Sequence, residues 1–181
     1  ILRGLAAEGA GPHPLEQWRD RQIAQLEELQ RTHKKGGARA TEDAVTLLAA
    51  EWAIDDRDAE RALTLLSALP PGVARRTQAL RLKLQAQRLA GDPAEGLRTA
   101  RLLAKHQAFS PSAAQSLLRS LARETLAGAR DADQLERAWQ QLDAVDHGDA
   151  FVAARAARRA AAFGDATRAR AWLQPLWERL A

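Results

Sequence analysis

The stretch from residue 76 to residue 110, RTQALRLKLQAQRLAGDPAEGLRTARLLAKHQAFS, decides the fold. Its pattern predicts a helix over about 77–90, a tight turn, and a second helix over about 93–107. Gly91 can take the left-handed conformation that ends a helix. Asp92 is a favourable N-cap, and the proline after it stands at the first helical position, where a missing N–H costs nothing. The stretch therefore predicts a helical hairpin.

Similar signals occur elsewhere in the 181 residues, at Gly164-Asp165 and, between two predicted pairs, at Gly148-Asp149. The composition also favours helices. Alanine and leucine supply most of the 46% hydrophobic content, while there is no tyrosine and only three phenylalanines. The predicted fold class is all-α.

Working outward from this hairpin, hydrophobic periodicity and helix-stop signals predict four helix pairs, at about 41–69, 77–107, 111–145 and 149–180. A helix over about 14–32 and a polar linker at 34–37 precede them. We expect residues 1–37 to be an N-terminal helix and linker that end a preceding repeat, and residues 38–181 to form a repeat solenoid.

Small residues recur early in the second helix of each predicted pair, where close helix approach requires them. They are Ala62, Gly96, Ala138 and Ala169, at intervals of 34, 42 and 31 residues. The first interval is that of tetratricopeptide repeats. An alanine-rich helical bundle could produce the same coincidences. The regular Gly-Asp turns favour a right-handed α-α superhelix of about four tetratricopeptide-like hairpins plus an N-terminal helix, with the first helices lining its concave side.

Several segments resemble the repeat region of the HemY family. These are LLAAEW (47–52), AERALTLL (59–66), GDPAE (91–95), ARLLAKH (100–106), FSP (109–111) and LERAWQQL (135–142), followed by an alanine-rich closing helix after Gly164. The resemblance covers about residues 40–180. It implies a scaffold without catalysis, linked to late haem synthesis and anchored in the bacterial inner membrane by spans absent from this chain. The expected partners are haem-pathway enzymes, with porphyrin a weaker expectation, and the domain is expected on the cytoplasmic face.

No pattern for catalysis or a cofactor occurs. Cysteine is absent, and the four histidines have no second ligand at metal spacing. A flavin enzyme that shares the HemY name would need a Gly-x-Gly-x-x-Gly turn after a strand, and neither is present. We expect no enzyme activity, no catalytic residue, no metal and no cofactor. An enzyme that uses carboxylates or histidine in a groove remains a rival interpretation.

The repeat register places a set of mostly basic side chains on the first helices, where they would line the concave side. The candidate partner-binding residues are Arg81, Gln85, Arg88, Arg119, Arg123, Arg155, Arg158 and Arg159. Guanidinium groups bind carboxylates well. The hypothesis is a groove for an acidic peptide or, more speculatively, for porphyrin propionates; the alternative is a solvated basic face. The net charge of +4 is modest, so no nucleic-acid partner is expected, although a nucleic-acid-binding helical repeat remains a rival.

The five tryptophans are expected mainly in core positions, except Trp177 in the last helix. That helix, with Leu173, Leu176 and Leu180, is too apolar to face water on every side, which predicts a covering continuation or self-association through it. The chain starts at Ile1 and has no methionine, so we expect an excised fragment of a longer protein; a trimmed initiator would look the same.

Overall fold

The computed structural model describes residues 14–32 and 37–181, and every regular element in these ranges is an α-helix. The all-α prediction is confirmed for them, whereas the predictions for residues 1–13 and for linker residues 34–36 lie outside the described ranges. The chain divides into two compact units, residues 1–49 and 50–181, with the division inside helix α2. A domain boundary after residue 37 stays a prediction.

In the first unit, helix α1 spans Pro14–Thr32, as the periodicity predicts. Trp18 is more than half exposed, so the expected core position is wrong for this residue. Helix α2 spans Ala38–Asp55, so it begins before the predicted start at about residue 41. The Thr41 hydroxyl donates at 2.8 Å to the carbonyl of Gly37, the residue that precedes the helix.

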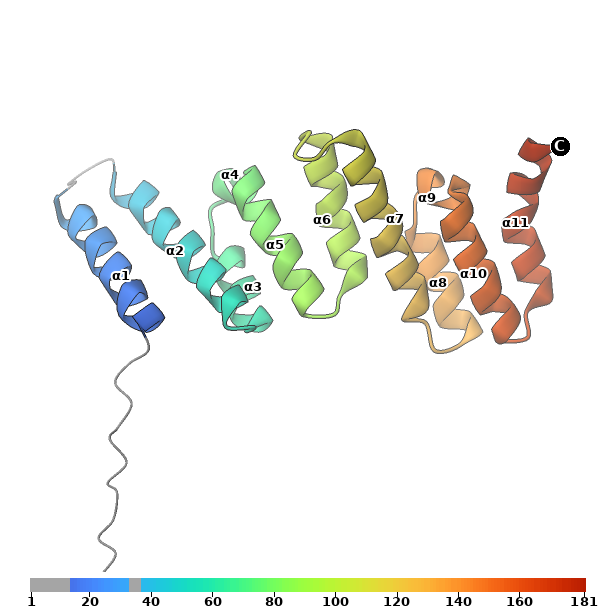
Figure 1. Cartoon of the computed structure of the whole chain (residues 1–181), viewed down its shortest axis with the longest axis horizontal. Helices are drawn as coiled ribbons and strands as arrows, with labels where there is room; N and C mark the ends of the chain where they lie inside the picture. The colour runs from blue at the N-terminus through green and yellow to red at the C-terminus, as the bar shows by residue number, and fades with distance from the viewer. Residues whose placement is uncertain (1–13, 33–36) are drawn as a thin grey trace, which may run out of the picture. The chain divides into compact units, whose positions relative to one another are not determined.

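The second unit continues from the end of α2 as a series of helices that Figure 1 shows in chain order from cyan to red. They are α3 (Ala59–Ser67), α4 (Pro71–Ala74), α5 (Thr77–Leu89), α6 (Pro93–Lys105), α7 (Pro111–Ala127), α8 (Ala132–Gln141), α9 (Ala144–Gly148), α10 (Ala150–Ala162) and α11 (Ala166–Leu180). Each long helix packs on a neighbour: α3 on α5, α5 on α6, α6 on α7, α7 on α10, and α10 on α11.

The tight turn predicted at Gly91-Asp92 is found three times. Its left-handed residues are Arg57, Gly91 and Gly164, with φ values of 61°, 72° and 82°. In each turn the next residue is an aspartate whose N–H bonds back to the last helical turn, and whose carboxylate caps the following helix. Gly148 differs from the prediction because it ends α9 without a positive φ, although Asp149 does cap α10.

Aspartate N-caps recur at the start of α3, α6, α8 and α11. These four are Asp58, Asp92, Asp131 and Asp165, at intervals of 34, 39 and 34 residues. In the small-residue position, four residues after each cap, stand Ala62, Gly96, Leu135 and Ala169. Ala138 was predicted to lie early in its helix, but it lies in the second half of α8, because the second interval, of 39 residues, carries extra residues and Leu135 fills the position.

The third pair of helices, α7 and α8, is consequently packed less closely than α5 and α6 or α10 and α11. Its turn, from Gly128 to Asp131, lacks a left-handed residue, and α7 makes few contacts with α8 although it packs closely on α6 and α10. The pair of helices predicted at about 111–145 is three helices, because Leu142 is extended and separates α8 from α9. The side chain of Leu135 is fully buried between these elements.

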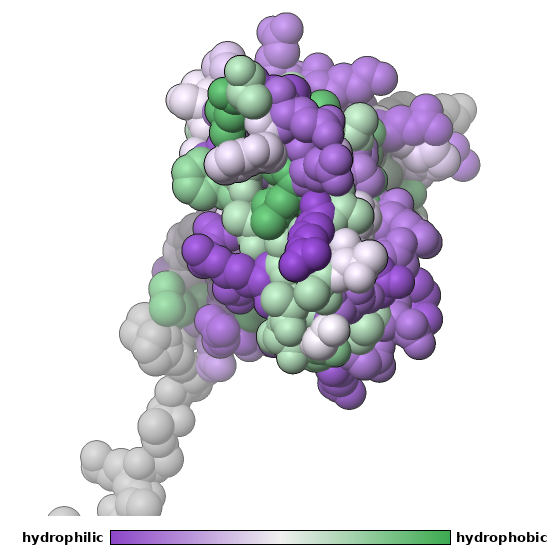
Figure 2. All heavy atoms as spheres, turned by 90° about the vertical axis from the view of Figure 1, so that its right-hand side faces the viewer, coloured by the Kyte–Doolittle hydropathy of each residue, from purple (hydrophilic) through white to green (hydrophobic). Residues whose placement is uncertain are grey.

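One continuous core joins α5 through α11, with leucines 97, 103, 121, 126 and 135 at its centre. The buried side chains of Thr99 and Gln87 form a hydrogen bond, in which the Thr99 hydroxyl donates to Gln87 Oε1 at 2.7 Å. As predicted, Trp139 is buried in the core and Trp172 packs half-buried against it. The two rings stack on each other, with 4.6 Å between their centroids. Seen from the α11 end, Figure 2 shows apolar side chains interspersed with charged ones, and Trp177 is 75% exposed.

Candidate functional site

The eight predicted partner-binding residues lie on α5, α7 and α10, and the structure divides them into two groups. In the first group the side chain binds within the protein. Arg81 donates to the Ala108 carbonyl at 2.9 Å, beyond the end of α6. Arg159 donates to the Ala129 carbonyl at 2.7 Å, with its guanidinium 4.9 Å from the centroid of the Phe163 ring.

Two more members of this group form ion pairs. Arg119 Nη2 lies 2.8 Å from Asp149 Oδ2, and its guanidinium covers the Phe151 ring at 4.4 Å. Arg88 faces Glu124 at 3.9 Å, with both side chains nearly half exposed, so this contact is loose. Partner binding by Arg81, Arg119 and Arg159 would require a ligand to compete with these intramolecular contacts.

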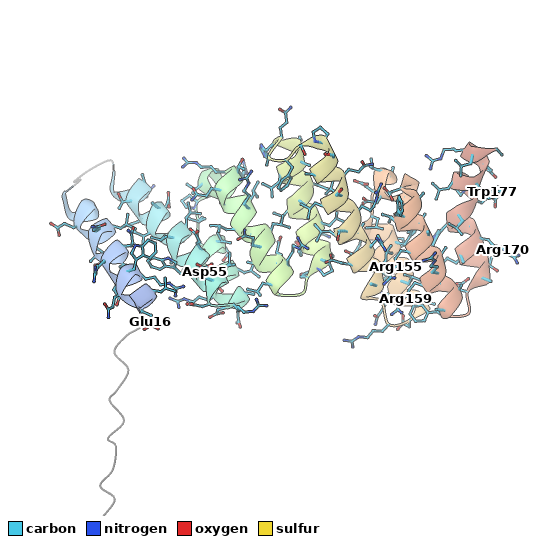
Figure 3. The ribbon with its side chains drawn as sticks, in the orientation of Figure 1. Glu16, Asp55, Arg155, Arg159, Arg170 and Trp177 are labelled. Carbon is cyan, nitrogen blue, oxygen red and sulfur yellow. The ribbon has the colours of Figure 1, made fainter. Side chains whose placement is uncertain are left out.

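The second group is free: Gln85, Arg123, Arg155 and Arg158 are exposed, and none makes a side-chain hydrogen bond or ion pair within residues 14–32 and 37–181. Arg123 and Arg155 line one shallow depression of about 190 Å³ between α7 and α10. Figure 3 labels Arg155 and Arg159 on α10. Arg123, Arg155 and Arg158 are therefore guanidinium groups without a partner among the described residues, and they lie on α7 and α10, which pack on each other.

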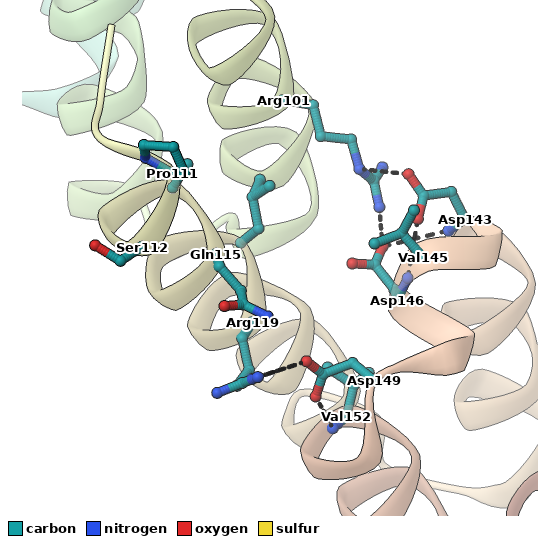
Figure 4. Close-up of a pocket in the computed structure, with 12 residues that line it drawn as sticks. Arg101, Pro111, Ser112, Gln115, Arg119, Asp143, Val145, Asp146, Asp149 and Val152 are labelled. Atoms are coloured by element: carbon teal, nitrogen blue, oxygen red, sulfur yellow. Dashed lines mark hydrogen bonds and ion pairs between the residues drawn. The ribbon is translucent and has the colours of Figure 1, made fainter. Parts of the chain in front are cut away.

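A larger cavity, of about 600 Å³, lies on the opened side of the third hairpin. Its walls come from the start of α7, from α9 and from the start of α10, with one residue of α6 (Figure 4). Apolar side chains supply much of the wall: Pro111, Ala114, Leu118, Val145 and Val152. We name this the α7–α9 pocket.

Five charged side chains line the α7–α9 pocket in two groups. Arg101 reaches from α6 to α9, where its Nε is 3.1 Å from Asp143 Oδ2 and its Nη2 bonds to Asp146 Oδ2. Asp143 and Asp146 also bond each other's backbone N–H groups, which forms the capping box that starts α9. The second group is the Arg119–Asp149 pair between α7 and α10.

Burial and these contacts shift the carboxyl pKa values of Asp143, Asp146 and Asp149 in different directions. Burial is the largest influence on Asp146 and raises its pKa, against the opposing charge of Arg101. Burial acts in the same direction on Asp143, but the hydrogen bond from the Asp146 backbone and the charge of Arg101 outweigh it, so the pKa of Asp143 is lowered. The pKa of Asp149 is also lowered, because hydrogen bonds from Arg119 and the Val152 N–H exceed the effect of burial.

Of the charged wall residues, only Arg119 was among the predicted partner-binding residues, and it was expected on a concave face; Arg101, Asp143, Asp146 and Asp149 were missed. One signal was available: Asp143-Ala-Val-Asp146 resembles a capping box and would have predicted a new helix start. No local pattern marks Arg101, because its partners are more than forty positions away along the chain. The described residues contain no group of three or more histidine or acidic side chains arranged to hold a metal ion.

Comparisons with protein-family models, curated proteins and solved structures found no match to this chain. Among the helices described, none combines the length and apolar character that crossing a membrane requires.

Proposed function

We propose that this chain is a non-catalytic protein-interaction module built from tetratricopeptide-like helical hairpins. The Asp-capped turn recurs at 34, 39 and 34 residues, and the first and last intervals match the tetratricopeptide period. Three pairs of successive helices also pack closely, α5 on α6, α6 on α7 and α10 on α11, as stacked hairpins must. A right-handed superhelix with the first helices on its concave side is part of this proposal.

The proposed partner is an acidic polypeptide segment that binds Arg123, Arg155 and Arg158. The observation that carries the proposal is that these three guanidinium groups are exposed and unpaired on neighbouring first helices, whereas Arg119 and Arg159 beside them are engaged within the protein. Guanidinium groups bind carboxylates in a bidentate geometry, and unpaired ones need give up no internal contact to do so.

An enzyme is the second candidate, because Asp143 and Asp146 have pKa values shifted in opposite directions beside a cavity. The contacts made by the two carboxylates favour a structural origin for these shifts. Burial accounts for the raised pKa of Asp146, and the hydrogen bond from the Asp146 backbone together with Arg101 accounts for the lowered pKa of Asp143, without catalysis. Catalytic function would need a further titratable group facing the same space.

The test is fluorescence anisotropy with a labelled peptide of alternating glutamate and alanine. Replacement of Arg123, Arg155 and Arg158 by glutamate should weaken binding at least about tenfold, since three charge pairs become repulsive. A matched control replaces Arg61, Arg137 and Arg170, which are equally exposed and lie on α3, α8 and α11. It changes the net charge by the same amount.

Equal weakening by both triple variants would show a general charge effect and would overturn the proposed site. Two further probes address the rivals. A peptide with glutamine in place of glutamate should not bind, and a single-stranded oligothymidine should bind more weakly than the acidic peptide. Tighter binding of the oligonucleotide would favour a nucleic-acid partner.

The narrower proposal is that the module belongs to a HemY-type scaffold of late haem synthesis at the bacterial inner membrane. It is supported by the sequence segments that resemble that family. Its test is binding of the chain to purified haem-pathway enzymes, together with absorbance titrations of haemin and protoporphyrin. No binding to any of these would remove the narrower proposal and leave the acidic-segment proposal standing.

A further inference from the structure

We infer that Glu124 is an internal competitor of the acidic partner: it pairs with Arg88 in place of a partner carboxylate and so limits the affinity of the site. The inference rests on the proposed function, because it concerns the same arginine surface. Glu124 was not among the predicted site residues. Its contacts, its position beside the free arginines and the exposure of its pair with Arg88 carry the inference.

One oxygen of the Glu124 carboxylate makes two contacts. Oε1 accepts the hydroxyl of Ser120, one turn earlier on α7, at 3.0 Å. The same oxygen lies 3.9 Å from Nη2 of Arg88, which reaches it from α5. Arg88 is one of the predicted partner-binding arginines, and a carboxylate already faces it. Glu124 therefore stands where a partner carboxylate would bind Arg88.

Glu124 also lies beside the arginines that are free to bind. The shallow depression between α7 and α10 is lined by Ser120, Arg123, Glu124, Ala127 and Arg155. An acidic side chain thus shares this wall with two unpaired guanidinium groups. It repels any carboxylate that approaches them, and like charges brought together at an interface lower affinity. Glu124 consequently acts against the partner at Arg123 and Arg155 as well as at Arg88.

The Arg88–Glu124 pair is one that a ligand can replace. Both side chains are 47% exposed, and exposed ion pairs contribute little to stability. By contrast, Arg119 lies 2.8 Å from Asp149, whose side chain is 14% exposed, so that pair is held more firmly. Binding of an acidic segment should therefore release Arg88 from Glu124, which makes Arg88 a fourth guanidinium group of the site beside Arg123, Arg155 and Arg158.

The experiment is a double-mutant cycle on binding of the labelled glutamate–alanine peptide, measured by fluorescence anisotropy. Glu124→Gln keeps an oxygen that can accept the Ser120 hydroxyl and removes only the charge, and it should tighten binding about fivefold. Arg88→Gln should weaken binding less than about twofold in the parent protein, where Glu124 occupies Arg88, but about fivefold in the Glu124→Gln background. The charge change is the same in both backgrounds, so the difference measures competition for Arg88.

Glu95→Gln is the matched control, because it removes the same charge and releases Arg98, its partner at 2.8 Å on α6, outside the depression. It should change the affinity less than about twofold. Equal tightening by Glu95→Gln and Glu124→Gln, or an equal effect of Arg88→Gln in both backgrounds, would overturn the inference. If the parent protein binds the peptide and Glu124→Gln changes nothing, the inference alone falls. If neither protein binds it, the acidic-segment proposal falls as well.

Discussion

Arg119 Nη2 lies 2.8 Å from Asp149 Oδ2, and the same aspartate caps helix α10, so one ion pair joins the middle of α7 to the start of α10. Asp149→Asn retains a capping side chain but removes the charge. We expect a loss of about 1 kcal/mol in the free energy of unfolding at pH 7. Urea denaturation provides the measurement.

The pH dependence of this loss has a defined sign. Because the pKa of Asp149 is lowered in the folded protein, its ionised form contributes fully above the ordinary value of 3.8, and the contribution is lost as the pH falls through the folded pKa. The stability difference between the parent protein and Asp149→Asn should therefore be constant near neutrality and shrink below about pH 4. A difference that grows on acidification would contradict the assignment.

Asp146 should behave in the opposite way. Its pKa is raised, so its ionised form opposes folding at pH values above the raised pKa, and this opposition disappears as the pH falls below the ordinary value. Asp146→Asn should consequently be at least as stable as the parent protein at pH 7. Thermal unfolding at pH 7 and pH 4 tests this, and a clear loss at pH 7 would mean that the ion pair with Arg101 outweighs burial.

The left-handed turn residues predict a pair of substitutions with opposite effects. Arg57 has a φ of 61° and Gly91 has a φ of 72° in equivalent turns. A side chain at such a φ costs about 1–2 kcal/mol, so Arg57→Gly should stabilise the protein and Gly91→Ala should destabilise it. A methyl group at Gly91 would meet no atom within 4 Å, which leaves the backbone as the cause. Urea midpoints that move in the same direction for both would contradict this reason.

Local signals explain which parts of the fold could be predicted. Where a capping Asp or Ser and a Pro start a helix, as at Asp92-Pro93 and Ser110-Pro111, the predicted and observed starts agree, and Gly91 marks the end of α5. Arg57 could not be predicted as a left-handed residue, because the stability of the surrounding helices imposes that conformation on an ordinary side chain. The break at Leu142 was missed because periodicity continues across it, while the Asp143–Asp146 capping box starts a new helix.

The contacts of the candidate arginines could not be predicted from the sequence. Repeat register could place arginines on the first helices, but it could not tell which of them bind within the protein. Arg159 turns to the Ala129 carbonyl and Arg81 to the Ala108 carbonyl, contacts made across 30 and 27 positions of the chain. The α7–α9 pocket is lined by residues from α6, α7, α9 and α10, which come together only once the helices are packed.

The Gln87–Thr99 hydrogen bond predicts a coupled pair in the core. Both residues are almost fully buried, so Thr99→Val leaves the Gln87 amide without its partner and should cost about 1–3 kcal/mol. Gln87→Leu together with Thr99→Val should cost less than the sum of the two single changes, because no polar group is then stranded. A double-mutant cycle by urea denaturation measures the coupling, and strict additivity would mean that water replaces the lost partner.

Helix α11 predicts self-association, because Trp177 and Leu180 on it are 75% and 84% exposed. Figure 3 shows Trp177 projecting from α11 away from the other helices. Burial of such a ring between two copies of the chain removes a large apolar surface from water, which favours a concentration-dependent dimer. Trp177→Glu should return the protein to a monomer in sedimentation equilibrium. Leu102→Glu, at an exposed apolar position on α6, is the matched control and should leave the dimer intact. If the parent protein is monomeric at every concentration, this face is covered by something other than a second copy, or it faces water.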